Sequence, residues 1–121
     1  VNPEVIVAFH SDGAVAPLLG DLIEIGVDVF NPVQPNVPGH EPDALKREFG
    51  DDLAFWGAID QQNLLPHGTP QAIEADVAEK IRVLGDGGGY LCAPAHIIQA
   101  DTSMAHVNAF IAAVKGNGVY G

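Results

Sequence analysis

Four short apolar runs, each ending in polar residues, constrain the fold of this chain more than any other feature. The first run, Val5–Phe9, ends in His10-Ser11-Asp12-Gly13. The other runs are Val27–Phe30, Leu53–Trp56 and Tyr90–Ala93, and they end in Asn31-Pro32-Val33-Gln34, Gly57-Ala58-Ile59-Asp60-Gln61 and Pro94-Ala95-His96. Uninterrupted apolar runs are typical of strands that a parallel sheet buries on both faces. Because the carboxyl ends of parallel strands meet at one edge, the pattern predicts one site fed by four loops.

A segment with helical periodicity follows each run. Apolar residues recur at helical spacing over residues 15–25, 43–49, 70–84 and 104–115. Thr69 and Ser103 are the expected N-caps of the last two helices, and Gly116 is the expected end of the last one. That helix is expected to bury four apolar side chains, Val107, Phe110, Ile111 and Val114. The proline-rich residues 31–42 are expected to form a long loop.

The resulting order, βαβαβαβα, predicts a parallel α/β fold. Right-handed crossovers between parallel strands give either a doubly wound sheet or part of a barrel. The periodicity of the chain fits both architectures equally well. Its 121 residues are enough for one domain and too few for two.

Composition excludes some classes of partner and indicates the cellular compartment. The chain carries 16 acidic and 5 basic residues, a formal charge of -11, which argues against nucleic acid and anionic membrane surfaces as partners. The single cysteine, Cys92, fits a reducing compartment, and its apolar neighbours predict an inert core thiol. No apolar run approaches the ~20 residues of a membrane span, so a cytoplasmic location is expected. The chain opens on Val1 and not on methionine, which predicts that it is a fragment of a longer protein.

Five segments, in this order, resemble the C-terminal half of the uroporphyrinogen decarboxylase superfamily. They are Phe9-His10-Ser11-Asp12-Gly13, Asn31-Pro32-Val33-Gln34-Pro35, Phe55-Trp56-Gly57-Ala58-Ile59-Asp60, Leu65-Pro66-His67-Gly68-Thr69-Pro70 and Gly88-Gly89-Tyr90-Leu91-Cys92-Ala93-Pro94-Ala95-His96. The resemblance covers nearly all of residues 1–121. It implies that they form a single domain, the parallel (βα)4 half of a TIM (β/α)8 barrel, with the four units as strands five to eight. The superfamily includes uroporphyrinogen decarboxylases and methyltransferases that serve corrinoid proteins and thiols.

Three polar residues in these segments, His10, Asp12 and His96, are competent ligands for zinc or iron. The thiol methyltransferase branch is similar, with a His-x-Cys pair after the matching strand and a cysteine after the last strand, which together hold zinc. Here His10 matches the family histidine, while Asp12 and His96 fall at or near the two cysteine positions. The residues themselves also fit a second interpretation, in which both histidines only form hydrogen bonds in a polar barrel mouth.

Four residues are predicted to be catalytic: His10, Asp12, Asp60 and His96. Asp60 fits an acid/base role and the role of a turn former equally well. Three more are predicted to bind substrate, namely Asn31, Gln34 and Gln61, although the first two also fit hydrogen bonding to loop backbone. The remaining histidines, His40, His67 and His106, are expected to be exposed to solvent.

The resemblance favours metal-assisted methyl transfer linked to a corrinoid protein or a thiol, and the expected cofactor is either zinc or none. The first alternative is decarboxylation of uroporphyrinogen, in which the family's N-terminal half supplies clustered arginines. The five basic residues here all fall on predicted helices, away from the strand ends. The second alternative is a non-catalytic half barrel that serves in assembly. The expected partners are a small-molecule substrate or corrinoid protein, together with a second copy in a homodimer or the N-terminal half of the same protein.

Overall fold

The computed structural model describes residues 2 and 4–119. Its elements are, in order, β1 (Ala8–His10), a 3-10 turn η1 (Ala16–Leu18), α1 (Leu19–Glu24), β2 (Val29–Val33), α2 (Pro42–Phe49), β3 (Ala54–Ile59), α3 (Leu64–His67), α4 (Pro70–Leu84), β4 (Tyr90–Pro94) and α5 (Met104–Asn117). The predicted α/β class is therefore confirmed. Within the described residues, no helix combines the length and the hydropathy that crossing a bilayer requires.

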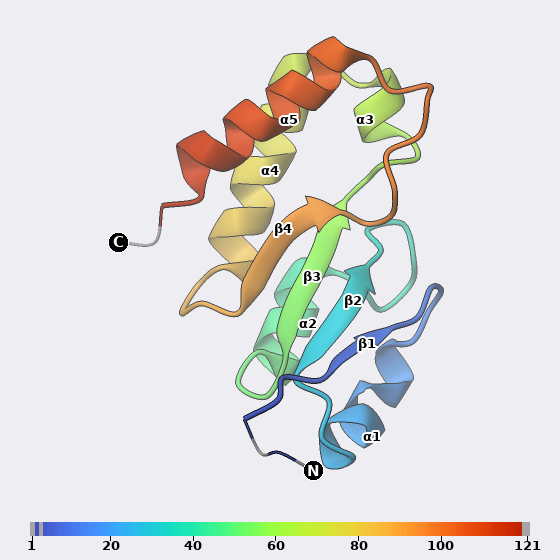
Figure 1. Ribbon diagram of the computed structural model, residues 1–121, viewed down its shortest axis with the longest axis vertical. Helices are drawn as coiled ribbons and strands as arrows, with labels where there is room; N and C mark the ends of the chain where they lie inside the picture. The colour runs from blue at the N-terminus through green and yellow to red at the C-terminus, as the bar shows by residue number, and fades with distance from the viewer. Residues whose placement is uncertain (1, 3, 120–121) are drawn as a thin grey trace.

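The strands form one parallel sheet in the order β1-β2-β3-β4 (Figure 1). Consecutive strands are therefore neighbours, as the family resemblance predicts for successive units of a barrel. This order is consistent with part of a (β/α)8 barrel, and closure of such a barrel by further strands stays a prediction. The single-domain assignment of residues 1–121 stays a prediction as well.

One face of the sheet is buried under helices. The strand register aligns Phe30, Phe55 and Tyr90 across β2, β3 and β4, and all three pack with helix residues such as Leu45 and Leu84. A second apolar cluster joins β3 to α3, α4 and α5 through Ile59, Leu65, Ile73, Val77 and Ala113. Figure 1 shows α2 behind the strands and α4 with α5 on the β4 side.

The opposite face of the sheet is open within the described part of the chain. Trp56 and Leu91 are register partners on β3 and β4, and they are 39% and 47% exposed. The first apolar run is exposed as well: Val5, Ile6, Val7 and Phe9 all face solvent, and only Ala8–His10 forms strand. The prediction of a buried first strand is therefore wrong. This strand lies at the edge of the sheet, where it pairs only with β2.

The N-caps follow the sequence pattern. The backbone N–H of Ala72 donates to Thr69 Oγ1 at 3.1 Å, and that of His106 donates to Ser103 Oγ at 3.2 Å. Both caps satisfy an N–H group that the first helical turn leaves without a partner. The predicted starts of α4 and α5 are therefore confirmed.

Other boundaries differ from the prediction. Helix α5 continues through Gly116 to Asn117, because the glycine lies on an exposed turn where it costs only about 1 kcal/mol. Its buried residue is Ala113, while Ile111 is 43% exposed and the other three predicted core residues, Val107, Phe110 and Val114, are partly buried. The predicted long loop is shorter, because β2 extends to Val33 through a cis Asn31–Pro32 peptide. The short helix α3 has no counterpart in the prediction.

Candidate functional site

Hydrogen bonds continue the strand pairing into the polar residues that follow the strands. The Ser11 N–H donates to the carbonyl of Asn31 at 2.9 Å, so the β1 tail stays paired with β2. At the other side, the Ala95 N–H donates to the carbonyl of Ile59 at 2.8 Å, which keeps the β4 tail beside β3. These bonds hold the residues that immediately follow at the carboxyl edge of the sheet.

Three of the predicted site residues, His10, Asp12 and His96, lie together at this edge. One ligand atom from each lies within 4.8 Å of the other two. His10 Nε2 is 3.8 Å from Asp12 Oδ2, and the two imidazole rings stand edge to face with centroids 6.4 Å apart. The side chains of His10 and Asp12 are 57% and 55% exposed, so a ligand can approach from solvent. The fold thus unites residues that are 86 positions apart in the chain, 96 minus 10.

Asn31 fixes the orientation of His10. The Asn31 Oδ1 lies 2.6 Å from His10 Nδ1 and accepts a hydrogen bond from the Nδ1–H group, because an amide oxygen cannot donate. The neutral ring then keeps its free lone pair on Nε2, the nitrogen that faces Asp12. Metal-binding histidines in proteins are typically oriented by such a bond to the second ring nitrogen.

The donor set of the cluster fits zinc. Two imidazoles and a carboxylate are common zinc ligands, and tetrahedral bonds of about 2.0–2.2 Å place ligand atoms roughly 3.4 Å apart. The 3.8 Å between His10 and Asp12 is close to that spacing. No two of the three ligand atoms are more than 4.8 Å apart, so movements of about an ångström would bring them to the zinc spacing. Exposed side chains make such movements readily by rotating about their χ angles.

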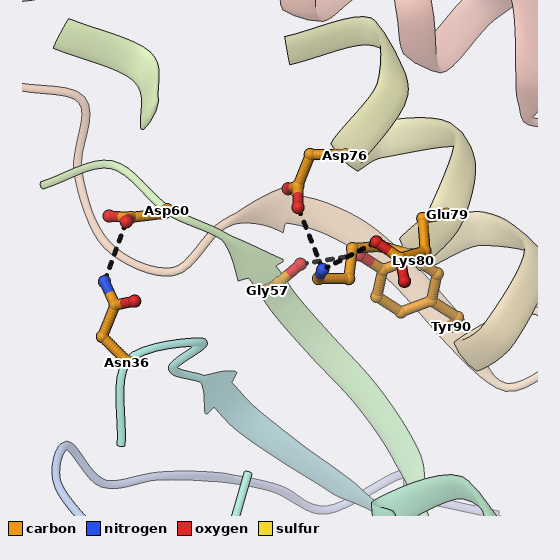
Figure 2. Close-up of polar contacts among 7 residues, drawn as sticks. All are labelled: Asn36, Gly57, Asp60, Asp76, Glu79, Lys80 and Tyr90. Carbon is orange, nitrogen blue, oxygen red and sulfur yellow. Dashed lines mark hydrogen bonds and ion pairs between the residues drawn. The ribbon is translucent and has the colours of Figure 1, made fainter. Parts of the chain in front are cut away.

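Asp60 organises the loops beside this cluster (Figure 2). Its Oδ1 accepts from the backbone N–H groups of Gln62 and Asn63 at 2.8 and 3.0 Å, and its Oδ2 accepts from the Asn36 and Asn63 side chains at 2.8 and 3.0 Å. Partial burial raises the pKa of Asp60, but these four hydrogen bonds outweigh it, and the net pKa lies below the usual range. The contacts match the turn-forming interpretation, and a catalytic role for Asp60 stays a prediction.

The predicted substrate-binding residues take different positions. Besides Asn31 on His10, the Oε1 of Gln34 accepts the backbone N–H of Gly13, next to Asp12. Both amides therefore support the loop after β1. Gln61 is buried and lines a cavity described below.

Two of the histidines expected on the surface are not fully exposed. His40 is 1% exposed and stacks edge to face on Phe30, with ring centroids 5.6 Å apart. Its Nδ1 accepts the backbone N–H of Gln34 at 3.2 Å, and burial lowers the pKa of the ring. His106 is partly buried, and its Nδ1 donates to the Leu65 carbonyl at 2.7 Å. Both rings form hydrogen bonds with backbone groups inside the fold. Such partners cannot be inferred from the residue type alone.

His67 and Cys92 agree with their predictions. His67 is exposed on α3, as expected. Burial raises the pKa of the Cys92 thiol, which keeps it protonated near neutral pH and fits an inert thiol.

Two cavities flank the cluster, and His96 lines both. The first, of about 370 Å³, lies on the open face of the sheet and is lined by His10, Asn31, Trp56, Pro94, Ala95, His96 and Ile97. The second, of about 530 Å³, is lined by Asp12, Gln34, Gln61, Gln62, His96, Gln99 and Asp101, and we call it the glutamine pocket. The sequence interpretation missed Trp56, Gln62, Gln99 and Asp101. For the last two, the polar segment that follows His96 was the available signal.

No basic side chain lines either cavity in the described part of the chain. The predicted placement of the basic residues on helices is confirmed, since they lie on α2, α4 and α5. Lys80 pairs with Asp76 on α4 at 2.9 Å (Figure 2), and Lys46 donates to Gly88, which precedes β4 at the opposite edge of the sheet. A polyanionic ligand therefore finds no counter-charge from these side chains at the carboxyl edge.

Comparison with known proteins agrees with the resemblance in sequence. The family described as uroporphyrinogen decarboxylase (URO-D) matches residues 1–117. A protein named uroporphyrinogen decarboxylase, from Sodalis glossinidius (strain morsitans), is 36% identical over 69 residues. The aligned part makes up 57% of this chain and 19% of that protein, so the match spans about a fifth of the relative's length. Because the family match extends over nearly the whole sequence, the chain belongs to the uroporphyrinogen decarboxylase family.

Proposed function

We propose that this chain is the part of a uroporphyrinogen decarboxylase-family enzyme that supplies a zinc site for methyl transfer linked to a corrinoid protein or a thiol. The observation that carries the proposal is the cluster of His10, Asp12 and His96, whose ligand atoms lie within 4.8 Å of one another. The cluster lies at the carboxyl edge of a parallel sheet, where α/β enzymes place their sites.

The residues of the chain prepare this site for a metal. When bound, zinc lowers the pKa of a coordinated thiol and so supplies a nucleophile at neutral pH. Asn31 holds the proton of His10 on Nδ1 and leaves Nε2 free. Asp12 contributes one negative charge, which stabilises a cation at the cluster. His10, Asp12 and His96 would be the three protein ligands, and the acceptor would complete the set, as substrate does in catalytic zinc sites.

Decarboxylation of uroporphyrinogen is the second candidate, favoured by the name of the relative from Sodalis glossinidius. In that case His96 would lie beside substrate, and the basic groups for its carboxylates would come from outside residues 2 and 4–119. The absence of any basic side chain from the two cavities of the described residues is why we place this candidate second.

Metal analysis and activity of the full-length protein test the proposal. We expect about one equivalent of zinc and methyl transfer from a methylated corrinoid to a thiol. His10→Ala should weaken zinc binding about tenfold or more, the usual size of a lost ligand or ligand support, with unchanged circular dichroism. His67→Ala, which alters an exposed histidine on α3, is the matched control and should leave affinity unchanged.

Three results separate the alternatives. Metal content below about a tenth of an equivalent, together with no methyl transfer, would overturn the proposal. Conversion of uroporphyrinogen by metal-free protein would select decarboxylation. Neither activity in a folded full-length protein would instead favour the non-catalytic assembly role.

A further inference from the structure

The smaller of the two cavities beside the cluster has an exposed indole in its wall. This cavity, of about 370 Å³, is lined by Trp56 together with His10 and His96 among others, and we call it the tryptophan cavity. Trp56 is 39% exposed, although its neighbours along β3, Phe55 and Gly57, are buried. Its side chain belongs to neither apolar cluster of the described fold. The indole is therefore available to a ligand that enters the cavity.

The strand register places Trp56 beside the predicted metal ligand His10. Phe30 and Phe55 are register partners on β2 and β3, and both are fully buried under the helices. The residues that follow them, Asn31 and Trp56, therefore face the open side of the sheet, because successive side chains of a strand alternate. Asn31 is also the register partner of His10, and its Oδ1 lies 2.6 Å from His10 Nδ1. A molecule in the tryptophan cavity thus contacts both the indole and the cluster.

The charges around this cavity favour a cation. Within the described residues, neither a lysine nor an arginine lines the tryptophan cavity or the glutamine pocket. Asp12 Oδ2 lies 3.8 Å from His10 Nε2, and Asp101 lines the glutamine pocket, which shares His96 with the tryptophan cavity. The chain as a whole carries a formal charge of -11. The electrostatic field at this edge of the sheet therefore attracts cations and repels anions.

An indole face beside acidic groups is suited to an ammonium group. Tryptophan attracts cations more strongly than other aromatic side chains do, and the attraction acts within about 6 Å of the ring centre. The predicted zinc site does not oppose such binding, because Asp12 and the thiolate of an acceptor together offset the charge of the metal ion.

We infer that the tryptophan cavity is a subsite for an alkylammonium group, which Trp56 binds through the face of its indole ring. The inference rests on the proposed function in one respect, namely that the ammonium group belongs to the thiol acceptor, whose sulfur lies at the cluster of His10, Asp12 and His96. The acceptor is then an aminothiol, and thiols that carry only an anionic group are rejected.

Choline and 3,3-dimethylbutan-1-ol are matched probes, because a carbon atom replaces the quaternary nitrogen while the shape stays the same. Each would be titrated into metal-free, full-length protein labelled with ¹⁵N, and the indole N–H resonance that Trp56→Leu removes would be followed by NMR. We expect a saturable shift, with choline bound about fivefold more tightly, the size of one cation–π contact at a partly exposed ring. Added salt should weaken the binding of choline and leave that of the alcohol unchanged.

Variants locate the effect, with binding measured through the methyl signal of each probe. Trp56→Leu removes the ring but keeps an apolar side chain, so it should bring the ratio of the two affinities to about one. Phe9→Leu is the matched control, because Phe9 is an exposed aromatic residue that lines neither cavity beside the cluster. Equal affinities for the two probes in the unsubstituted protein, or a ratio that Trp56→Leu leaves unchanged, would overturn the inference. The first of these comparisons needs no variant to fold.

Methyl transfer separates this inference from the proposed function. With a methylated corrinoid as donor, 2-aminoethanethiol should exceed 2-mercaptoethanesulfonate in kcat/KM by about fivefold or more, because the two thiols differ mainly in the sign of their charge. Transfer that prefers the sulfonate would sustain the proposed function and overturn the inference. Choline selectivity that depends on Trp56, in a protein that neither takes up zinc nor transfers a methyl group, would overturn the proposed function and sustain the ammonium subsite.

Discussion

The bond between Asn31 and His10 leads to the sharpest prediction for the zinc site. Asn31→Ala removes the amide oxygen that lies 2.6 Å from His10 Nδ1. The ring then loses both its fixed tautomer and its fixed rotation. Asn31→Asp keeps an acceptor at the same position, and a carboxylate in that role raises the basicity of the ring.

The exposure of His10 sets the size of the effect. Loss of such a supporting group typically weakens metal affinity by about 10–100-fold, which is roughly 1.4–2.7 kcal/mol. The His10 side chain is 57% exposed, so water replaces part of the lost hydrogen bond. We therefore expect the lower end, about tenfold or ~1.4 kcal/mol, for Asn31→Ala, and affinity equal to or above that of the unsubstituted protein for Asn31→Asp.

Competition with a chromogenic chelator would measure zinc affinity, and ¹⁵N NMR would report which His10 nitrogen carries the proton. Asn36→Ala is the matched control, because Asn36 donates to Asp60 and does not contact His10. Unchanged affinity in Asn31→Ala would refute the reasoning. Equal losses in Asn31→Ala and Asn31→Asp would show that the position matters only for folding.

Three further predictions concern stability. Val77→Ala should lower the free energy of unfolding by about 2 kcal/mol, since it removes two fully buried methyl groups. Glu79→Ala, the control, should change it by less than ~0.5 kcal/mol. Equal effects of the two substitutions in urea denaturation would contradict the packing of α4. Thr69→Ala should cost about 1 kcal/mol through loss of the N-cap, and an unchanged melting curve would remove the cap from α4. Burial lowers the pKa of His40 below 6.5, so the unfolded state binds more protons under mildly acidic conditions and stability should fall as pH drops below about 6.5. His40→Gln should flatten that part of the stability profile, and an unchanged slope would assign it to other groups.

The helices were predictable because they depend on local patterns. Thr69-Pro70 carries its cap and its first helical position in two adjacent residues, and α4 begins there. The sheet order was predicted from the family resemblance instead, because consecutive βα units also fit a doubly wound sheet with another strand order. Local signals also brought His10, Asp12 and His96 to one edge, because each follows the end of a strand.

The rest depended on tertiary contacts that residue type does not show. Val5–Phe9 has the composition of a buried strand but lies at the sheet edge, where nothing in the described chain covers it. His40 has a polar side chain but is buried, because its ring accepts a hydrogen bond from the backbone N–H of Gln34 and packs edge to face on Phe30. Gln61 could be placed near the site from sequence, but its burial became visible only with the loop packed.

The open face of the sheet predicts how residues 1–121 should behave when expressed alone. Trp56 and Leu91 on that face are 39% and 47% exposed, and β1 and β4 leave unpaired strand edges in the described sheet. Covering a large apolar side chain contributes roughly 1.5–3 kcal/mol, so covering these two would add about 3–6 kcal/mol, a large share of the ~5–15 kcal/mol that stabilises a small domain. An uncovered edge also pairs readily with another strand. We expect the isolated chain to self-associate, with a two-fold dimer as the smallest assembly, whereas a chain that supplies the N-terminal half should cover the same face from within. Light scattering at micromolar concentration, combined with urea denaturation, would test this: a cooperatively folded 12.6 kDa monomer would show that the open face needs no cover and would count against a half barrel. Trp56→Ser and Leu91→Ser together should then shift the isolated chain towards monomer, because they remove the apolar pair at the centre of that face.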